Sequence, residues 1–177
     1  AADKTPPHVK MDEKNHVEEP FLQQLENMPG LHWQVLRLDN YQAPDETQRT
    51  DFTQVFMRKD LTAALKKINP WLEEDQLQEV VEKITHFEND NLLQNNELAL
   101  QLLLNGTTVT ENRTTGEKSP NVSIVDFDHP ENNSYVAVSQ FKVRIPGTDN
   151  HIYPDIICFL NGLPVVLVEC KSPKTKE

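Results

Sequence analysis

Several features that would place the chain outside the globular, water-soluble proteins are missing from its sequence. No apolar run approaches the roughly 18 residues that a membrane-spanning helix needs, and residues 165–168 form one of its typical short runs. The first fifteen residues are charged and contain no apolar core, so no secretory signal is visible. Glycine is scarce, at 5 residues, and no repeat or low-complexity tract occurs. These absences argue against membrane-embedded and secreted proteins and favour a cytoplasmic protein.

Positive charge is also scarce. The 177 residues include 17 Lys and Arg against 28 Asp and Glu, which gives a formal net charge of −11. A protein that binds nucleic acid on its own normally carries a basic excess, because contacts to phosphates supply most of its affinity. If this chain acts on nucleic acid, another domain or a metal ion must therefore supply positive charge.

Cysteine is limited to Cys158 and Cys170. In a tight hairpin these residues would lie about six positions apart along the paired strands, on the order of 20 Å at ~3.3 Å per residue. A disulfide needs Cα atoms closer than about 7 Å. We therefore expect two buried thiols, as is usual for a cytoplasmic protein, and two cysteines are too few for a structural zinc site.

The beginning of the chain has the pattern of a tail followed by a helix. Residues 1–14 are polar and without periodicity, so we expect a disordered tail or a vector-derived extension. Apolar residues then recur at helical spacing as far as Met28. Asn15 and Glu18 resemble a capping pair. Pro20 requires the helix to begin close by, because proline is tolerated only in the first turn.

The rest of the chain divides into a helical block and a strand block. After a short predicted strand at residues 33–38, residues 50–104 follow the helical period, with a break at Asp60, a good N-cap residue. From residue 106 the period becomes two, which predicts a meander of strands. The last two strands, within residues 152–171, are apolar on both faces, so we expect both to be central and covered. The pattern predicts an α+β fold, in which an N-terminal helix and an inserted helical segment pack on a mixed, largely antiparallel sheet with a central hairpin.

Three ionisable residues stand at the open end of the last predicted hairpin. Asp155 precedes its first apolar strand, and Glu169 and Lys171 follow its second. Buried charges are costly unless they are paired or bound to metal. The alternative is that these residues only mark where the strands emerge into solvent.

The turn of this hairpin decides whether the two carboxylates share a face. A two-residue turn at Asn161 and Gly162 would place Asp155 and Glu169 on opposite faces. A three-residue turn, with Gly162 left-handed in a bulge, would place them on one face as diagonal neighbours, with Cα atoms ~7–8 Å apart. Two carboxylates at that spacing can meet on one hard cation such as Mg²⁺. We predict the three-residue turn.

Pro154 and Asp155, followed after a gap by Glu169, Cys170 and Lys171, resemble the metal-nuclease pattern of the restriction-endonuclease-like fold. The resemblance implies that Asp155 and Glu169 hold Mg²⁺, together with the backbone carbonyl of Cys170. Lys171 would orient the attacking water and help to deprotonate it, while the metal offsets charge on the scissile phosphate.

A larger part of the chain is similar to one nuclease family. Residues 154–173 closely resemble the nuclease segment of the restriction (R, motor) subunit of type I restriction-modification enzymes. Residues 16–25, 49–72 and 125–141 are similar to the family's opening helix, its inserted helices and the strand pair before the nuclease hairpin. The match covers about residues 13–175.

This resemblance implies a nuclease domain at the N-terminus of a large subunit whose ATP-driven translocase follows it. With methyltransferase and specificity subunits, the complex would cut unmodified double-stranded DNA. Residues 15–177 would form an incomplete endonuclease domain, with a helical insertion at about 50–105 and a sheet at about 106–171. A later helix and the translocase are absent. ATP would bind only in that translocase, because the present sequence has no Gly-x-x-x-x-Gly-Lys-Ser/Thr motif.

Further candidates depend on the same resemblance. The family's opening helix carries an active-site glutamate, for which Glu18 is the first choice and Glu19 the reserve; a capping role for Glu18 stays open. Gln140 would hydrogen-bond to the site residues, or is a polar residue at the sheet edge. Plausible phosphate contacts, which also fit an ordinary charged rim, are Lys142, Arg144, Lys171, Lys174 and Lys176.

Two other functions fit the same residues. The chain could be a non-catalytic docking module, whose acidic helices bind the motor or the methyltransferase core. It could also be another phosphodiesterase of the same fold, which would differ only in substrate. Cation binding by Asp155 and Glu169 distinguishes a docking module from a nuclease.

Overall fold

The computed structural model of the chain describes residues 14–86 and 92–171. The predicted N-terminal tail, apart from Lys14, therefore lies outside the described residues. The elements, in chain order, are η1 (Lys14–Glu18, a π-helical turn), α2 (Glu19–Glu26), β1 (Gln34–Arg37), η2 (Pro44–Thr47), α3 (Arg58–Ile68), α4 (Glu74–Thr85), α5 (Leu92–Asn105), β2 (Thr107–Thr108), β3 (Asn121–Val122), η3 (Pro130–Asn132), β4 (Tyr135–Ser139), β5 (Val143–Arg144), β6 (His151–Ile152), β7 (Ile156–Leu160) and β8 (Leu163–Val168).

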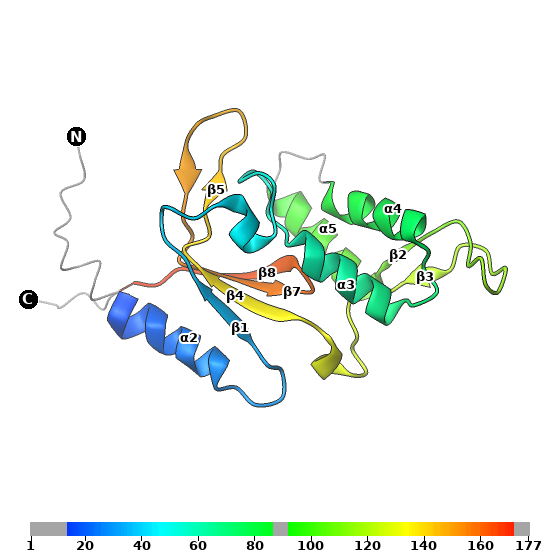
Figure 1. Ribbon diagram of the computed structural model, residues 1–177, viewed down its shortest axis with the longest axis horizontal. Helices are drawn as coiled ribbons and strands as arrows, with labels where there is room; N and C mark the ends of the chain where they lie inside the picture. The colour runs from blue at the N-terminus through cyan, green and yellow to red at the C-terminus, as the bar shows by residue number, and fades with distance from the viewer. Residues whose placement is uncertain (1–13, 87–91, 172–177) are drawn as a thin grey trace, which may run out of the picture.

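A four-stranded sheet in the order β1-β4-β7-β8 forms the centre of the molecule (Figure 1). β1 runs parallel to β4, and the pairs β4–β7 and β7–β8 are antiparallel. Helix α2 lies beside β1, while α3, α4 and α5 gather near the turn of the β7–β8 hairpin. This arrangement confirms the predicted α+β fold. No helix in the described part of the chain combines the length and the apolar character needed to cross a membrane.

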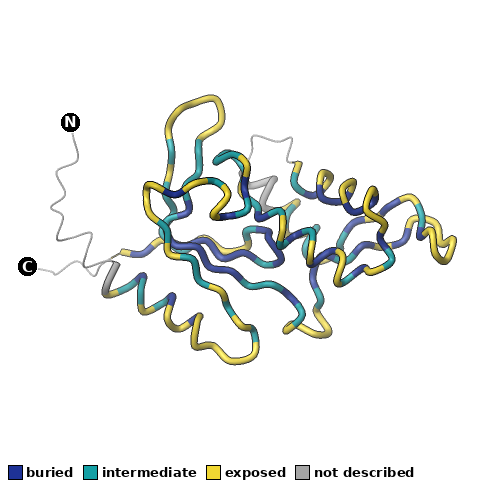
Figure 2. Tube along the Cα trace, in the orientation of Figure 1, coloured by how far each residue is buried: buried dark blue, intermediate teal, exposed yellow. Residues whose placement is uncertain are grey.

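The central strands are buried on both faces, as the buried stretches of the trace show (Figure 2). Successive side chains of a strand point to opposite faces. On one face Ala137 of β4 belongs to a cluster with Leu22 of α2, and on the other Val138 belongs to a cluster with Phe141. A third cluster joins α3 and α4 to Leu163 at the turn of the hairpin. The hairpin is thus anchored at its turn, while its open end reaches the cleft described below.

β8 does not have the position expected from its sequence. It is an edge strand, and Val165, Val166 and Leu167 are 39–60% exposed. β7 is buried along almost all its length. The expectation of two central, covered strands is therefore confirmed for β7 and wrong for β8. An apolar run indicates that a strand can be buried on both faces, but it does not say whether a neighbour covers it.

The helical block also differs from its prediction. Residues 50–57 are not helical, and α3 begins at Arg58 after an N-cap position occupied by Met57. Asp60 is therefore not an N-cap; its carboxylate instead accepts hydrogen bonds from Gln48 Nε2 (2.9 Å) and Ser134 Oγ (3.3 Å). These long-range partners explain why a good N-cap residue stands inside the first turn.

Candidate active site

The turn between β7 and β8 has two residues instead of three. Leu160 pairs with Leu163. Asn161 and Gly162, between them, both have positive φ, at 49° and 79°, as in a type I′ turn. The predicted three-residue turn is therefore wrong.

Tertiary contacts select this tighter turn. The buried side chain of Asn161 accepts a hydrogen bond from the Ser134 backbone N–H (2.7 Å) and donates one to the Ile124 carbonyl (2.8 Å). A Cβ atom on Gly162 would lie 2.4 Å from the carbonyl oxygen of Met57. Asparagine tolerates the left-handed conformation, and only glycine fits so close to a neighbouring backbone.

A β-bulge further along the hairpin supplies the extra residue that the turn lacks. The register shifts between Cys158 and Phe159, which leaves Val165 as the bulged residue of β8. A shift of one residue moves the side chains beyond it to the other face. When the register is continued past Ile156 and Val168, Asp155 and Glu169 lie opposite each other on one face. This continuation agrees with the predicted shared face, although it places the pair directly opposite and not diagonally.

The carboxyl groups of Asp155 and Glu169 interact with each other. Glu169 is exposed. Its pKa is nevertheless raised, first by slight desolvation and then by the negative charge of Asp155 and a hydrogen bond with it, while the nearby Lys171 lowers it. Asp155 Oδ2 also accepts a hydrogen bond from the Cys170 backbone N–H (2.8 Å). The charge of Asp155 thus disfavours ionisation of Glu169, and a divalent cation bound between the two groups would relieve the repulsion.

Both cysteines are buried thiols, as expected. Burial raises the pKa of the Cys158 thiol. Cys158 pairs with Val166, so Cys170 lies four positions further along the ladder, about 13 Å away at ~3.3 Å per residue. The predicted separation of six positions was too large, but four positions also exclude a disulfide.

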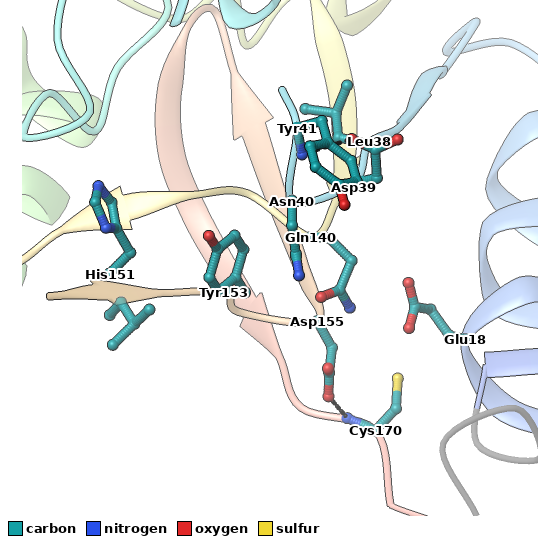
Figure 3. Close-up of a pocket in the computed structure, with 11 residues that line it drawn as sticks. Glu18, Leu38, Asp39, Asn40, Tyr41, Gln140, His151, Tyr153, Asp155 and Cys170 are labelled. Atoms are coloured by element: carbon teal, nitrogen blue, oxygen red, sulfur yellow. Dashed lines mark hydrogen bonds between the residues drawn. The ribbon is translucent and has the colours of Figure 1, made fainter. Parts of the chain in front are cut away.

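Asp155 opens onto a cleft of about 710 Å³. Figure 3 shows the cleft between the end of the sheet, the loop after β1 and the start of the first helix. Its lining residues are Glu18, Leu38, Asp39, Asn40, Tyr41, Gln140, His151, Ile152, Tyr153, Asp155 and Cys170. Three of these described residues are acidic, and none is Lys or Arg. The cleft therefore attracts a cation, and it repels a phosphate group that has no cation beside it.

The structure separates Glu18 from its neighbour Glu19. Glu18 is 4% exposed, and its side chain points into the cleft (Figure 3). Its carboxylate accepts a hydrogen bond from Ser139 Oγ. It makes no side-chain cap for α2. Glu19 lies outside the cleft and forms an ion pair with Arg37 (2.7 Å), which also binds Glu26 (2.7 Å). Glu18, the first choice from the sequence, is therefore the glutamate that reaches the cleft.

Gln140 also reaches the cleft. It follows the last residue of β4 with a φ of 60°, and this left-handed turn lets its backbone N–H donate to the Asp155 carbonyl (3.0 Å). Its side chain lines the cleft. His151 lines the same cleft and packs edge-on against Phe52, with ring centroids 5.9 Å apart.

The predicted phosphate contacts are more scattered. Lys142 Nζ lies 4.8 Å from the centroid of the Phe52 ring, and Arg144 Nη2 forms an ion pair with Asp51 (3.1 Å). Lys171 is exposed. Lys174 and Lys176 lie outside the described residues.

Comparison with known proteins identifies the family. A model of the type I restriction enzyme R protein N terminus matches residues 10–177. The chain belongs to this family. The predicted relationship to the N-terminal nuclease domain of type I restriction subunits is thereby confirmed.

The relatives are type I restriction proteins and are much longer. The chain is 37% identical, over 125 residues, to the type I restriction enzyme HindI endonuclease subunit of Haemophilus influenzae. This alignment covers 71% of this chain and 12% of that protein. It is 27% identical over 171 residues to a Methanocaldococcus jannaschii protein provisionally named type I restriction enzyme MjaIXP endonuclease subunit, covering 96% of this chain and 16% of that protein. The chain thus spans 12–16% of their length. No solved structure matches the chain.

The described part of this R-protein domain offers no complete set of side-chain metal ligands. Across the described ranges, no three His, Cys, Asp or Glu side chains gather in a way that could hold a metal ion. The predicted ligand set requires only the side chains of Asp155 and Glu169, with the third oxygen from the Cys170 carbonyl. Oxygen donors of this kind are those that Mg²⁺ prefers.

Some residues of the cleft were not singled out from the sequence. Tyr153 and Tyr41 line it, and Ser139 holds Glu18. Tyr153 stands directly before Pro154 and Asp155, so its proximity to the pattern was available in the sequence. Ser139 is a polar residue in the apolar run of β4, a position that calls for a buried partner. No pattern in the sequence indicated that Tyr41 would line the cleft.

Proposed function

We propose that this chain is the Mg²⁺-dependent endonuclease domain of a type I restriction enzyme R subunit. It would hydrolyse phosphodiester bonds of unmodified double-stranded DNA after ATP-driven translocation by the rest of the subunit. Methyltransferase and specificity subunits would complete the assembly. The observation that carries the proposal is the position of Asp155 at the cleft, where its carboxylate accepts a hydrogen bond from the backbone N–H of Cys170, the residue between Glu169 and Lys171.

The donor set of the hairpin fits Mg²⁺. Asp155, Glu169 and the Cys170 carbonyl would hold the ion, and a cation bound there would offset the negative charge of Asp155 that raises the pKa of Glu169. Bound there, Mg²⁺ would offset charge on the scissile phosphate and lower the pKa of the attacking water. The Cys170 N–H orients the Asp155 carboxylate. Lys171 orients the water and takes part in its deprotonation.

The negative charge of the chain is compatible with this function. The cleft carries Glu18, Asp39 and Asp155, and the whole chain has a net charge of −11. Phosphates would be repelled from such a cleft in the absence of a cation. The translocase would then be needed to bring DNA to the site, as well as to move it.

Cleavage by the full enzyme tests the proposal. Plasmid cleavage with ATP and Mg²⁺ is compared for the wild type, Glu169→Ala and Glu79→Ala, with ATP hydrolysis followed in the same reactions. Glu79 is an exposed glutamate of α4, remote from the hairpin in sequence, and serves as the matched control. We expect Glu169→Ala alone to lose cleavage while ATP hydrolysis continues. Unchanged cleavage by Glu169→Ala would refute the catalytic assignment and favour the docking module.

A further inference from the structure

Ser139 is a buried hydroxyl in an otherwise apolar setting. It ends β4 and is 1% exposed. Its strand alternation places it on the same face as Ala137, within the cluster that also contains Leu22 and Leu25 of α2. A hydroxyl removed from water at such a position needs a hydrogen-bond partner.

That partner is the carboxylate of Glu18. Ser139 Oγ donates to Glu18 Oε1, and both residues are buried. The nearest arginine of β1, Arg37, is engaged by Glu19 and Glu26 instead. The serine hydroxyl thus holds the Glu18 carboxylate where that side chain lines the cleft.

Gln140, the residue after Ser139, contacts the segment that carries Asp155. The Gln140 backbone N–H donates to the Asp155 carbonyl, while the Ser139 side chain binds Glu18. Two consecutive residues thus connect two carboxylate-bearing segments that are far apart in the sequence. Their positions relative to each other depend on the end of β4.

We propose that Ser139 is a positioning residue for the nuclease site, which orients the Glu18 carboxylate toward Asp155 and so strengthens divalent-cation binding. The inference rests on the proposed function. The competing explanation is that serine is present only because a small residue fits beneath α2. Ser139→Ala keeps the small size and removes the hydroxyl, whereas Ser139→Thr keeps the hydroxyl.

Cation binding separates these explanations. Binding of Ca²⁺ and Mn²⁺ to the full-length R subunit is measured by calorimetry without nucleotide, and folding is checked by thermal unfolding. Glu18 is not one of the expected ligands, so its carboxylate would act from beside the ion, and loss of such an outer partner typically weakens metal affinity by about 10-fold or more. We expect that loss for Ser139→Ala and near-wild-type affinity for Ser139→Thr. Equal affinity of Ser139→Ala and the wild type would overturn the proposal.

A double variant tests whether Ser139 acts through Glu18. In the Glu18→Gln background, Ser139→Ala should cause no further loss of affinity; a full additional loss would show that the serine acts elsewhere and would also overturn the proposal. If the alanine variant does not fold, Ser139→Cys keeps the volume and donates only weakly, so it should still lose affinity, and wild-type affinity would contradict the proposal.

Glu169→Ala distinguishes the two proposals in the same assay. If it binds Ca²⁺ and Mn²⁺ as the wild type does, the metal site itself is wrong, whatever Ser139 does. If it abolishes binding while Ser139→Ala is silent, only the positioning role of Ser139 fails.

Discussion

Asn161 fixes the turn of the catalytic hairpin, and its replacement has a calculable cost. Its side chain is fully buried and makes three hydrogen bonds, accepting from the Ser134 N–H (2.7 Å) and donating to the Ile124 carbonyl (2.8 Å) and Asn133 Oδ1 (2.9 Å). Asn161→Ala removes all three, at roughly 1 kcal/mol of unfolding free energy each. Alanine at a φ of 49° costs roughly 1 kcal/mol more. We expect a loss of about 3–5 kcal/mol, a large part of the 5–15 kcal/mol typical of a domain.

Urea denaturation followed by tryptophan fluorescence measures this loss. Asn161→Gly is the control, because glycine adopts the left-handed conformation freely but makes none of the three hydrogen bonds. It should be more stable than Asn161→Ala by about 1 kcal/mol. An alanine variant within about 1 kcal/mol of the wild type would refute the argument that these buried hydrogen bonds select the two-residue turn.

Three further predictions follow from neighbouring contacts. Gly162→Ala should lose at least about 2 kcal/mol in the same urea assay, because its Cβ would lie 2.4 Å from the Met57 carbonyl oxygen at a φ of +79°; wild-type stability would contradict this. Arg37→Gln removes only partly exposed ion pairs, so it should cost at most about 1 kcal/mol and leave plasmid cleavage by the full enzyme intact. Asp155→Asn should lower the pKa of Glu169 in an NMR titration, because it removes a neighbouring negative charge. In the metal-free wild type this raised pKa means that the folded chain binds the proton more tightly, so stability falls as pH rises through that pKa; the variant should show a weaker fall.

The sequence was sufficient for the shared face of the two carboxylates but not for its cause. One extra residue in the hairpin puts Asp155 and Glu169 on the same face, whether it lies in the turn or in a bulge, so the prediction reached the shared face with the extra residue in the wrong place. The position of that residue, at Val165 and not in the turn, depends on contacts of Asn161 with segments distant in the sequence. Such contacts cannot be read from the spacing of the hairpin itself.

One residue, Pro164, could have predicted both the edge position of β8 and its bulge. Pro164 lies within β8, next to the bulged residue Val165. Proline has no N–H to donate to a ladder and is confined to edge strands, strand starts and bulges. Here β8 is an edge strand and also carries a bulge. Greater weight on this proline, and less on the apolar run that follows it, would have predicted both features.

The partner of Glu18 could not be predicted from the sequence around it. Its sequence context indicates a helix cap, and only the family resemblance suggested that it belongs to the site. Its observed partner, Ser139, lies on a strand near the other end of the chain, so no local pattern around either residue could pair them. A carboxylate and a hydroxyl that are both buried need hydrogen-bond partners, and here each is a partner of the other. For that reason the contact points to a constraint on the cleft, and not to the start of a helix.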